Sequence, residues 1–157
     1  MKDKVEVFNG VNGQAVIDVP QLNLRREWPR KGAKVLIKTD DLLEAIYDPG
    51  VEYMFKHGIL YTKDPEVNRE LGLVDDDTNE PTVTILDDAK MQRYLVNVPL
   101  PEFKNFVKTL SREQVRVMAD YAIEHEISVF DKSEIIKDIC GTDIIKSIEL
   151  NRADKEG

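Results

Sequence analysis

Hydrophobic and polar residues alternate near the start of the chain, and this alternation predicts β-strands. The period of two is typical of a strand with one buried face. Two Asn-Gly steps, at 9–10 and 12–13, separate the two alternating runs, and Asn-Gly favours tight hairpin turns. The pattern therefore predicts a β-hairpin over the first twenty residues, with these residues facing the core: Val5, Val7, Ala15, Ile17 and Val19.

A short strand and several short helices are predicted between residues 35 and 73. The apolar run 35–37 predicts a strand, and Thr39 after it is expected to cap a helix. Asp-Pro steps at 48–49 and 64–65 predict two further helix starts. An aspartate accepts hydrogen bonds from the first helical amides, and proline fits the first helical position.

Beyond residue 82 the hydrophobic period becomes that of helices. Residues 83–86 predict one last strand, after which Asp87 or Asp88 is expected to cap a helix. A stripe at the i, i+3, i+4, i+7 spacing predicts a helix with one buried face. Its members are Phe103, Phe106, Val107 and Leu110.

Helix starts are also marked in the last third of the chain. Ser111 and Gln114 have the spacing of a capping box, and so do Asp131 and Glu134. Thr142 is expected to cap the final helix.

These elements predict an α+β fold. A β-rich region with short helices is expected at 1–73, an acidic linker at 74–82, a helical region at 83–150 and a polar tail at 151–157.

Charge is distributed unevenly along the chain. The 22 basic and 30 acidic residues give a net charge of −8, yet residues 25–38 hold six basic residues and one acid, which is +5, so the remainder sums to −13. Residues 64–88 hold nine acids and one arginine, which is −8. Complementary patches steer encounter and fix register, so the pattern favours docking to an acidic partner or to other copies of the chain.

A protein interface is the preferred interpretation of these two patches. Exposed ion pairs contribute only about 0 to 1 kcal/mol each, so an apolar anchor is required. The only tryptophan is expected to provide it, in a concentration-dependent self-association that weakens with salt. Two alternatives stay open: the tryptophan packs in its own core, or the segment is a solvated basic strand edge. The interface residues predicted are Arg25, Arg26, Trp28, Arg30, Lys31 and Lys34 on the basic side, and Asp75, Asp76 and Asp77 on the acidic side.

No metal site is expected. The only soft ligands are His57, His125 and Cys140, and they are not paired at the spacing of a zinc site. In the acidic segment Asp75, Asp77 and Asn79 match three positions of a calcium loop. Its remaining key positions, a glycine and a bidentate acid, are not matched.

Enzyme activity is not expected either. The phosphate-binding glycine loop, the dinucleotide fingerprint and the nucleophile elbow are absent from the sequence. We therefore predict a non-enzymatic protein with no catalytic residues and no cofactor.

Nucleic-acid binding is the alternative function. Predicted helices at 133–140 and 144–151 have the lengths and the turn of a helix-turn-helix, and the arginines of 25–38 with their tryptophan are suited to clamping a single strand. Against this, Lys137 occupies a helix position that is normally small, and the net acidity disfavours phosphate contact. Nucleic acid is therefore ranked below protein as a partner.

The cellular compartment of the protein is predicted from features that the sequence lacks. It has no apolar run of membrane-spanning length, its first residues do not form a signal peptide, and it has a single cysteine. We expect a protein of the cytosol that does not bind membranes.

Three segments of the sequence are informative together: Leu-Arg-Arg-Glu-Trp-Pro-Arg-Lys-Gly-Ala-Lys at 24–34, Tyr-Asp-Pro-Gly-Val-Glu-Tyr-Met-Phe at 47–55, and Asp-Ile-Ile-Lys-Ser-Ile-Glu-Leu-Asn-Arg at 143–152. In these segments the chain resembles small uncharacterised proteins of tailed bacteriophages. The resemblance implies synthesis in the host cytoplasm and a structural or assembly role in the virion. The implied partners are other virion or assembly proteins, or further copies of the chain.

Overall fold

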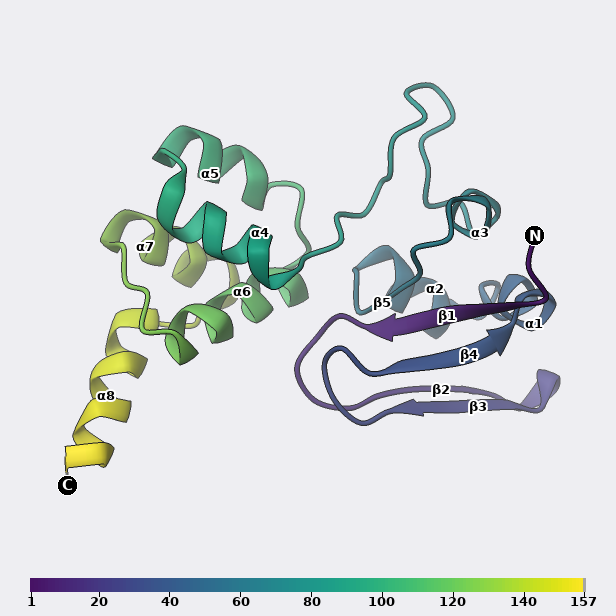
Figure 1. Cartoon of the computed structure of the whole chain (residues 1–157), viewed down its shortest axis with the longest axis horizontal. Coiled ribbons are helices and arrows are strands. Elements are labelled where there is room, and N and C mark those ends of the chain that lie inside the picture. The colour runs from purple at the N-terminus through teal and green to yellow at the C-terminus, as the bar shows by residue number, and fades with distance from the viewer. Residues whose placement is uncertain (157) are drawn as a thin grey trace. The chain divides into compact units, whose positions relative to one another are not determined.

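The computed structural model describes residues 1–156 and divides into two compact units, unit 1 (Met1–Ile85) and unit 2 (Leu86–Gly157) (Figure 1). Helices account for 51% of the residues and strands for 16%. The strands come first and most of the helix follows, so the predicted α+β fold is confirmed.

Unit 1 contains five strands, three helices and one 3₁₀ turn. In chain order they are β1 (Lys4–Asn9), β2 (Ala15–Val19), η1 (Pro20–Leu22), β3 (Leu24–Trp28), β4 (Lys34–Lys38), α1 (Thr39–Ala45), α2 (Pro49–Lys56), β5 (Leu60–Tyr61) and α3 (Pro65–Glu70). A three-stranded sheet has the order β4-β1-β5, a two-stranded sheet pairs β2 with β3, and every pairing is antiparallel.

The hairpin predicted for the first twenty residues is wrong. Strand β1 pairs with β4, with Val5 opposite Ile37 and Val7 opposite Val35, and does not pair with β2. The reason lies at Asn9, which is buried and organises the connection: its Nδ2 donates to Gly13 O at 2.8 Å and its Oδ1 accepts from Val11 N at 3.1 Å. The connection therefore leads the chain away to a second sheet.

Gly10 continues this connection in a place that admits no side chain. Its amide donates to Ile59 O at 2.7 Å, and a Cβ added to it would lie 2.6 Å from Gly58 O. The Asn-Gly step at 9–10 therefore serves a close approach between two backbone segments, and it does not form a hairpin turn.

One hydrophobic core joins the two sheets and the helices of unit 1. The indole of Trp28 lies fully inside it, and its Nε1 donates to Val7 O at 2.8 Å, which links β3 to β1. Buried residues of the core come from every strand and α-helix of unit 1, among them Val7, Ile17, Leu24, Ile37, Leu42, Val51, Phe55, Leu60 and Val67.

Local chemistry sets the helix starts of unit 1 at two of the three predicted places. Asp48 accepts hydrogen bonds from the first amides of α2, and Asp64 does the same for α3, each followed by proline. Both predictions are confirmed. Thr39 is not a cap, because it is the first residue of α1 and its hydroxyl donates to Lys2 O at 2.6 Å.

The acidic segment 74–82 belongs to unit 1 and has defined structure. Val74 and Pro81 form an isolated antiparallel bridge, and Thr82 N donates to Leu73 O at 2.9 Å. The boundary between the units lies a few residues later, after Ile85. The strand predicted at 83–86 does not form.

Unit 2 is built from helices. They are α4 (Asp88–Gln92), the π-turn η2 (Arg93–Asn97), α5 (Leu100–Val107), α6 (Arg112–Glu124), α7 (Phe130–Cys140) and α8 (Ile144–Glu156). Helix α8 continues to Glu156, so the predicted tail at 151–157 is helical as far as the structure describes it. The buried Phe103 and Val107 come from the predicted stripe on α5.

The caps of unit 2 follow the sequence in part. Asp87 caps α4, and the capping box of Ser111 with Gln114 opens α6, as predicted. The box predicted at Asp131 is wrong, because α7 already begins at Phe130 and has no side-chain cap. Asp143, not Thr142, accepts from the backbone of α8, at Lys146 N, 3.0 Å away.

Lys132 is a buried lysine that holds the end of another helical segment. Its Nζ donates to Tyr94 O at 2.8 Å, Leu95 O at 3.3 Å and Val98 O at 2.7 Å. The last carbonyls of a helix lack donors within that helix. Here the ammonium group of Lys132 is their hydrogen-bond donor. Burial lowers the pKa of Lys132 below its ordinary value.

Replacement of Trp28 by alanine should destabilise unit 1 strongly. The change removes a fully buried indole and its hydrogen bond to Val7, and a buried Trp-to-Ala substitution costs about 3–5 kcal/mol. Thermal and urea unfolding followed by circular dichroism measure the loss. Leu36→Ala, at a side chain 55% exposed, is the control and should change stability little. Equal stability of the two variants would contradict the placement of Trp28 in the core.

Replacement of Lys132 by methionine should destabilise unit 2. Methionine is an unbranched side chain of similar length, but it cannot donate to the three carbonyls that Lys132 Nζ contacts. Each buried group left unsatisfied costs about 1–3 kcal/mol. The exposed Lys104 on α5 provides the matched control, Lys104→Met. Amide hydrogen exchange in η2 should accelerate in the Lys132 variant alone, and unchanged protection there would refute the capping role.

Candidate protein-binding face

The basic segment 25–38 does not form one surface. Strand β3 carries its first residues in the two-stranded sheet, and strand β4 carries its last residues in the three-stranded sheet. Alternate residues on each strand then point to opposite sides. The six interface residues predicted in this segment are therefore distributed over several environments.

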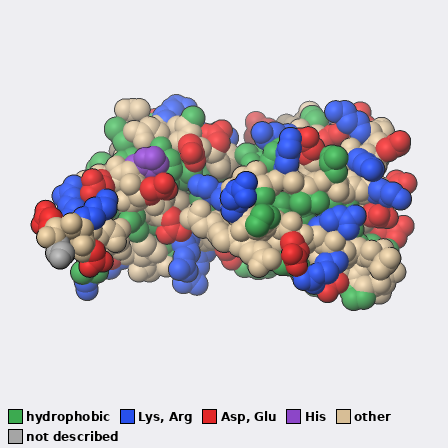
Figure 2. Space-filling view, turned by 60° about the horizontal axis from the view of Figure 1, so that its bottom comes forward, with side chains coloured by type: hydrophobic (Ala, Val, Ile, Leu, Met, Phe, Trp, Pro, Cys, Tyr) green, Lys and Arg blue, Asp and Glu red, His purple; other side chains and the backbone are tan. Residues whose placement is uncertain are grey.

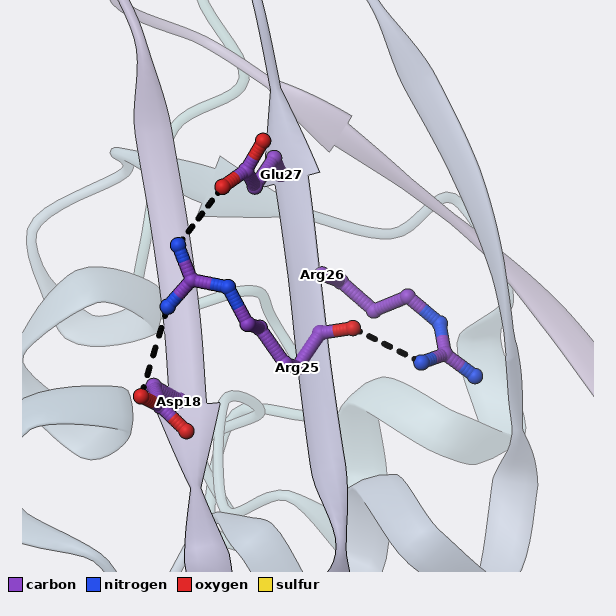
Figure 3. Close-up of polar contacts among 4 residues, drawn as sticks. All are labelled: Asp18, Arg25, Arg26 and Glu27. Carbon is purple, nitrogen blue, oxygen red and sulfur yellow. Dashed lines mark hydrogen bonds and ion pairs between the residues drawn. The ribbon is translucent and has the colours of Figure 1, made fainter.

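Arg25 lies on the outward face of the two-stranded sheet and already has acidic partners in its own unit (Figure 3). Its guanidinium contacts Glu27 Oε1 at 2.6 Å and Asp18 Oδ2 at 3.3 Å. The hydrogen bond and charge of Glu27, with a smaller contribution from Asp18, raise the pKa of Arg25. This arginine is thus locally neutralised and is a weak candidate for binding an acidic partner.

Arg26 and Trp28 lie on the other side of β3, which faces the core. Arg26 is half-buried and its Nη1 donates to Arg25 O at 2.8 Å, so it points away from the Arg25 cluster (Figure 3). Trp28 is completely buried. The expectation that Trp28 anchors an interface is therefore wrong, and the alternative that it packs in its own core describes the structure.

Arg30 and Lys31 occupy the turn between β3 and β4. The turn is closed by Ala33 N donating to Arg30 O at 3.1 Å, and Gly32 adopts a positive φ of 84°. Arg30 is exposed, whereas Lys31 is partly covered. Both lie outside the strands β3 and β4.

Lys34 and Lys38 lie on the outward face of β4, where other lysines join them. Lys4 of β1 is directly opposite Lys38. Like charges in that position destabilise a sheet unless a counter-charge is near. We call this surface the lysine face and define it by Lys2, Lys4, Phe8, Lys34, Leu36, Lys38, Tyr61 and Lys63.

Three apolar side chains lie near the middle of the lysine face, beside the acid Glu6. Leu36 is 55% exposed and lies opposite Glu6. Phe8 and Tyr61 are paired across β1 and β5, and their rings stack with centroids 5.3 Å apart. Lys63 Nζ lies 4.8 Å from the centre of the Phe8 ring. A surface with an apolar centre and a charged rim is the usual composition of a protein interface.

Two hollows open along this face. One, of 690 Å³, is lined by Lys4, Phe8, Leu36 and Lys63 together with the start of α3. A second, of 540 Å³, is lined by Lys2, Lys4, Lys38 and the start of α1. Lys2 and Lys4 belong to both, so the hollows adjoin one another. Figure 2 shows Lys and Arg side chains beside hydrophobic side chains on the surface of unit 1.

Most of the lysines on this face form no ion pair of their own in the part of the chain that the structure describes. Lys34 contacts Glu6 at 3.4 Å. Within the described residues 1–156, Lys2, Lys4, Lys38 and Lys63 form no ion pair. Acids line the same hollows. Asp64 caps α3, and Glu66 pairs with the N-terminal amine at 3.3 Å. Asp3 and Asp40 line the second hollow beside its lysines. The five lysines and the N-terminal amine exceed by one charge the five acids Asp3, Glu6, Asp40, Asp64 and Glu66, so the face keeps a small positive excess.

Sequence reasoning found Lys34 on this face but missed most of its members. The available signal was the alternation Lys-x-Leu-x-Lys at 34–38 and Lys-x-Glu-x-Phe at 4–8. Each run is typical of a strand with a polar outward face. Only the pairing of β1 with β4 brings the two runs together.

The predicted acidic residues Asp75, Asp76 and Asp77 lie in the loop after α3. The carboxylate of Asp75 accepts from Asp77 N at 2.8 Å and from Thr78 N at 3.1 Å, so it stabilises the loop itself. Asp76 and Asp77 are exposed, as is Glu80. The interface candidates on this loop are therefore Asp76, Asp77 and Glu80.

Other candidate chemistry is not assembled in the part of the chain that the structure describes. No group of three His, Cys, Asp or Glu residues is placed to hold a metal within residues 1–156. His57 stacks on Tyr53, and Cys140 is buried. In the helices that resemble a helix-turn-helix, Lys137 is exposed and pairs with Asp143 at 3.3 Å, and Arg152 of α8 pairs with Glu126 at 3.0 Å.

Among the described helices, none combines the length and the apolar character needed to cross a membrane. Comparison with known proteins found no matching family model, no matching curated protein and no matching solved structure.

Proposed function

We propose that this protein is a non-enzymatic assembly protein that binds other proteins through the lysine face. The observation that carries the proposal is the exposed Leu36 with the half-buried, stacked rings of Phe8 and Tyr61, inside a rim of lysines of which, within the described residues, only Lys34 forms an ion pair. An apolar centre supplies binding energy when water is excluded, and the charged rim guides encounter with an acidic partner.

The resemblance to small proteins of tailed bacteriophages supplies the context of this proposal. It points to a component of the virion or of its assembly, made in the host cytoplasm and binding other virion proteins. A protein that joins particle components needs persistent contact surfaces, and the lysine face is built on paired strands, which hold its side chains in fixed positions.

Leu36→Asp should prevent incorporation into the particle. The substitution places a charge at the apolar centre of the face, where desolvation of a carboxylate is unfavourable, while the exposed position lets unit 1 fold normally. Purified particles of a phage encoding each variant are analysed by quantitative mass spectrometry. Tyr47→Asp, at a residue 85% exposed outside the face, is the matched control and should be incorporated like the wild type.

Two results would contradict this proposal. One is absence of the wild-type protein from purified particles and from their assembly intermediates. The other is equal incorporation of the Leu36→Asp and Tyr47→Asp variants, since the face would then contribute nothing to assembly.

Nucleic-acid binding is the second candidate function, and the stacked pair of Phe8 and Tyr61 beside unpaired lysines favours it. Aromatic rings with neighbouring positive charge bind single strands by stacking and phosphate contact. Against it, Lys63 already covers Phe8 at 4.8 Å, and the chain carries a net charge of −8. Protein binding is therefore preferred.

A gel-shift titration with single-stranded DNA and RNA separates the two functions. We expect no shift at moderate salt, because the net negative charge opposes phosphate binding. A salt-sensitive shift that Tyr61→Ala and Lys38→Gln both abolish, with circular dichroism unchanged, would favour the nucleic-acid function. Lys104→Gln on unit 2 is the control for the loss of one positive charge.

A further inference from the structure

We propose that the lysine face of one copy binds the acidic loop, residues 74–81, of a second copy of this chain. The inference rests on the proposed function, because it names one partner of the same face. Both parts of the contact, the lysine face and the acidic loop, belong to unit 1.

The acidic loop is a structured turn. Asp75 N donates to Glu80 O at 2.8 Å, Asn79 N donates to Asp75 O at 2.8 Å, and the bridge of Val74 with Pro81 closes the base. Arg69 of α3 holds the side chain of Asn79. A preorganised loop loses little conformational entropy when it binds, which favours its use as a contact element.

The charges of the loop are available to a partner. Asp76, Asp77 and Glu80 are exposed and form no ion pair within residues 1–156. Figure 1 shows the loop standing off from α3. Four lysines of the lysine face are equally without acidic partners. Unpaired negative charge on a projecting loop therefore has a complement in these four lysines, beside which Asp3 and Asp40 also lie.

Apolar contact is also offered by both elements. Pro81 at the base of the loop is exposed, and the lysine face presents Leu36 between its lysines. Exposed ion pairs alone contribute about 0 to 1 kcal/mol each. The rest of the binding free energy would come from contacts with Leu36 and with the stacked rings of Phe8 and Tyr61.

The contact must form between chains. No ion pair joins the acidic loop to the lysine face in the described part of one chain, and the hydrogen bonds of the loop fix its position in unit 1. Because a loop meets a different surface on the neighbour, the contact is heterologous, and its repetition gives a ring or an open array.

Charge reversal on either side tests the contact. The loop variant is Asp76→Lys, Asp77→Lys and Glu80→Lys, and the face variant is Lys4→Glu, Lys38→Glu and Lys63→Glu. In sedimentation velocity the wild type should associate with rising concentration and dissociate with salt. Each variant alone should be monomeric, and an equimolar mixture should associate again because each altered surface meets a complementary one.

Matched controls carry the same changes of charge on unit 2. They are Glu134→Lys, Asp138→Lys and Asp154→Lys for the loop variant, and Lys104→Glu, Lys108→Glu and Arg116→Glu for the face variant, all at exposed positions. Both controls should associate like the wild type. Circular dichroism confirms that every variant is folded.

Three results would overturn the inference: a wild type that is monomeric at every concentration and salt, association of either variant alone, or a mixture that stays monomeric. The particle assay distinguishes these from failure of the proposed function. If the protein is monomeric but still enters particles in a Leu36-dependent manner, the proposed function stands, and the lysine face binds a different protein. If the chain self-associates but is absent from particles and their assembly intermediates, the contact between copies stands and the proposed function fails.

Discussion

The antiparallel pairing of β1 with both β4 and β5 is the constraint on which unit 1 depends. As the central strand, β1 directs Val5 and Val7 into the core and Lys4, Glu6 and Phe8 outward. A shift of one residue in this register would exchange the two sets and bury lysines. The same pairing therefore fixes the hydrophobic core and places lysines of distant segments side by side.

Burial of Trp28 decides which residues are left for binding. The indole fills the core and bonds to β1, so the segment that looks most like an interface in the sequence contributes its largest side chain to stability. The apolar side chains left on the lysine face are smaller and are surrounded by charge. The protein contact proposed for this surface would therefore have a modest binding energy that depends on salt.

Acidic residues have two distinct roles in this chain. Asp48, Asp64, Asp87 and Asp143 accept backbone hydrogen bonds at helix starts, and Asp75 does so inside a loop. Asp76, Asp77 and Glu80 have no such role and point to solvent. Charge counted along the sequence therefore overstates the acidic surface that is available to a partner. Lysines divide in the same way, between the exposed lysine face and the buried Lys132.

The sequence by itself determined the features that depend on neighbouring residues. The α+β class, the Asp-Pro helix starts and the capping box at Ser111 follow from hydrogen bonds and periodicity within a few positions. Tertiary structure alone decided the pairing of β1 with β4, the burial of Trp28 and the composition of the lysine face. The physical reason is that a strand's alternation shows that it has two faces but does not identify its partner. That choice depends on packing between residues about thirty positions apart, such as Val7 and Val35, and no local pattern records it.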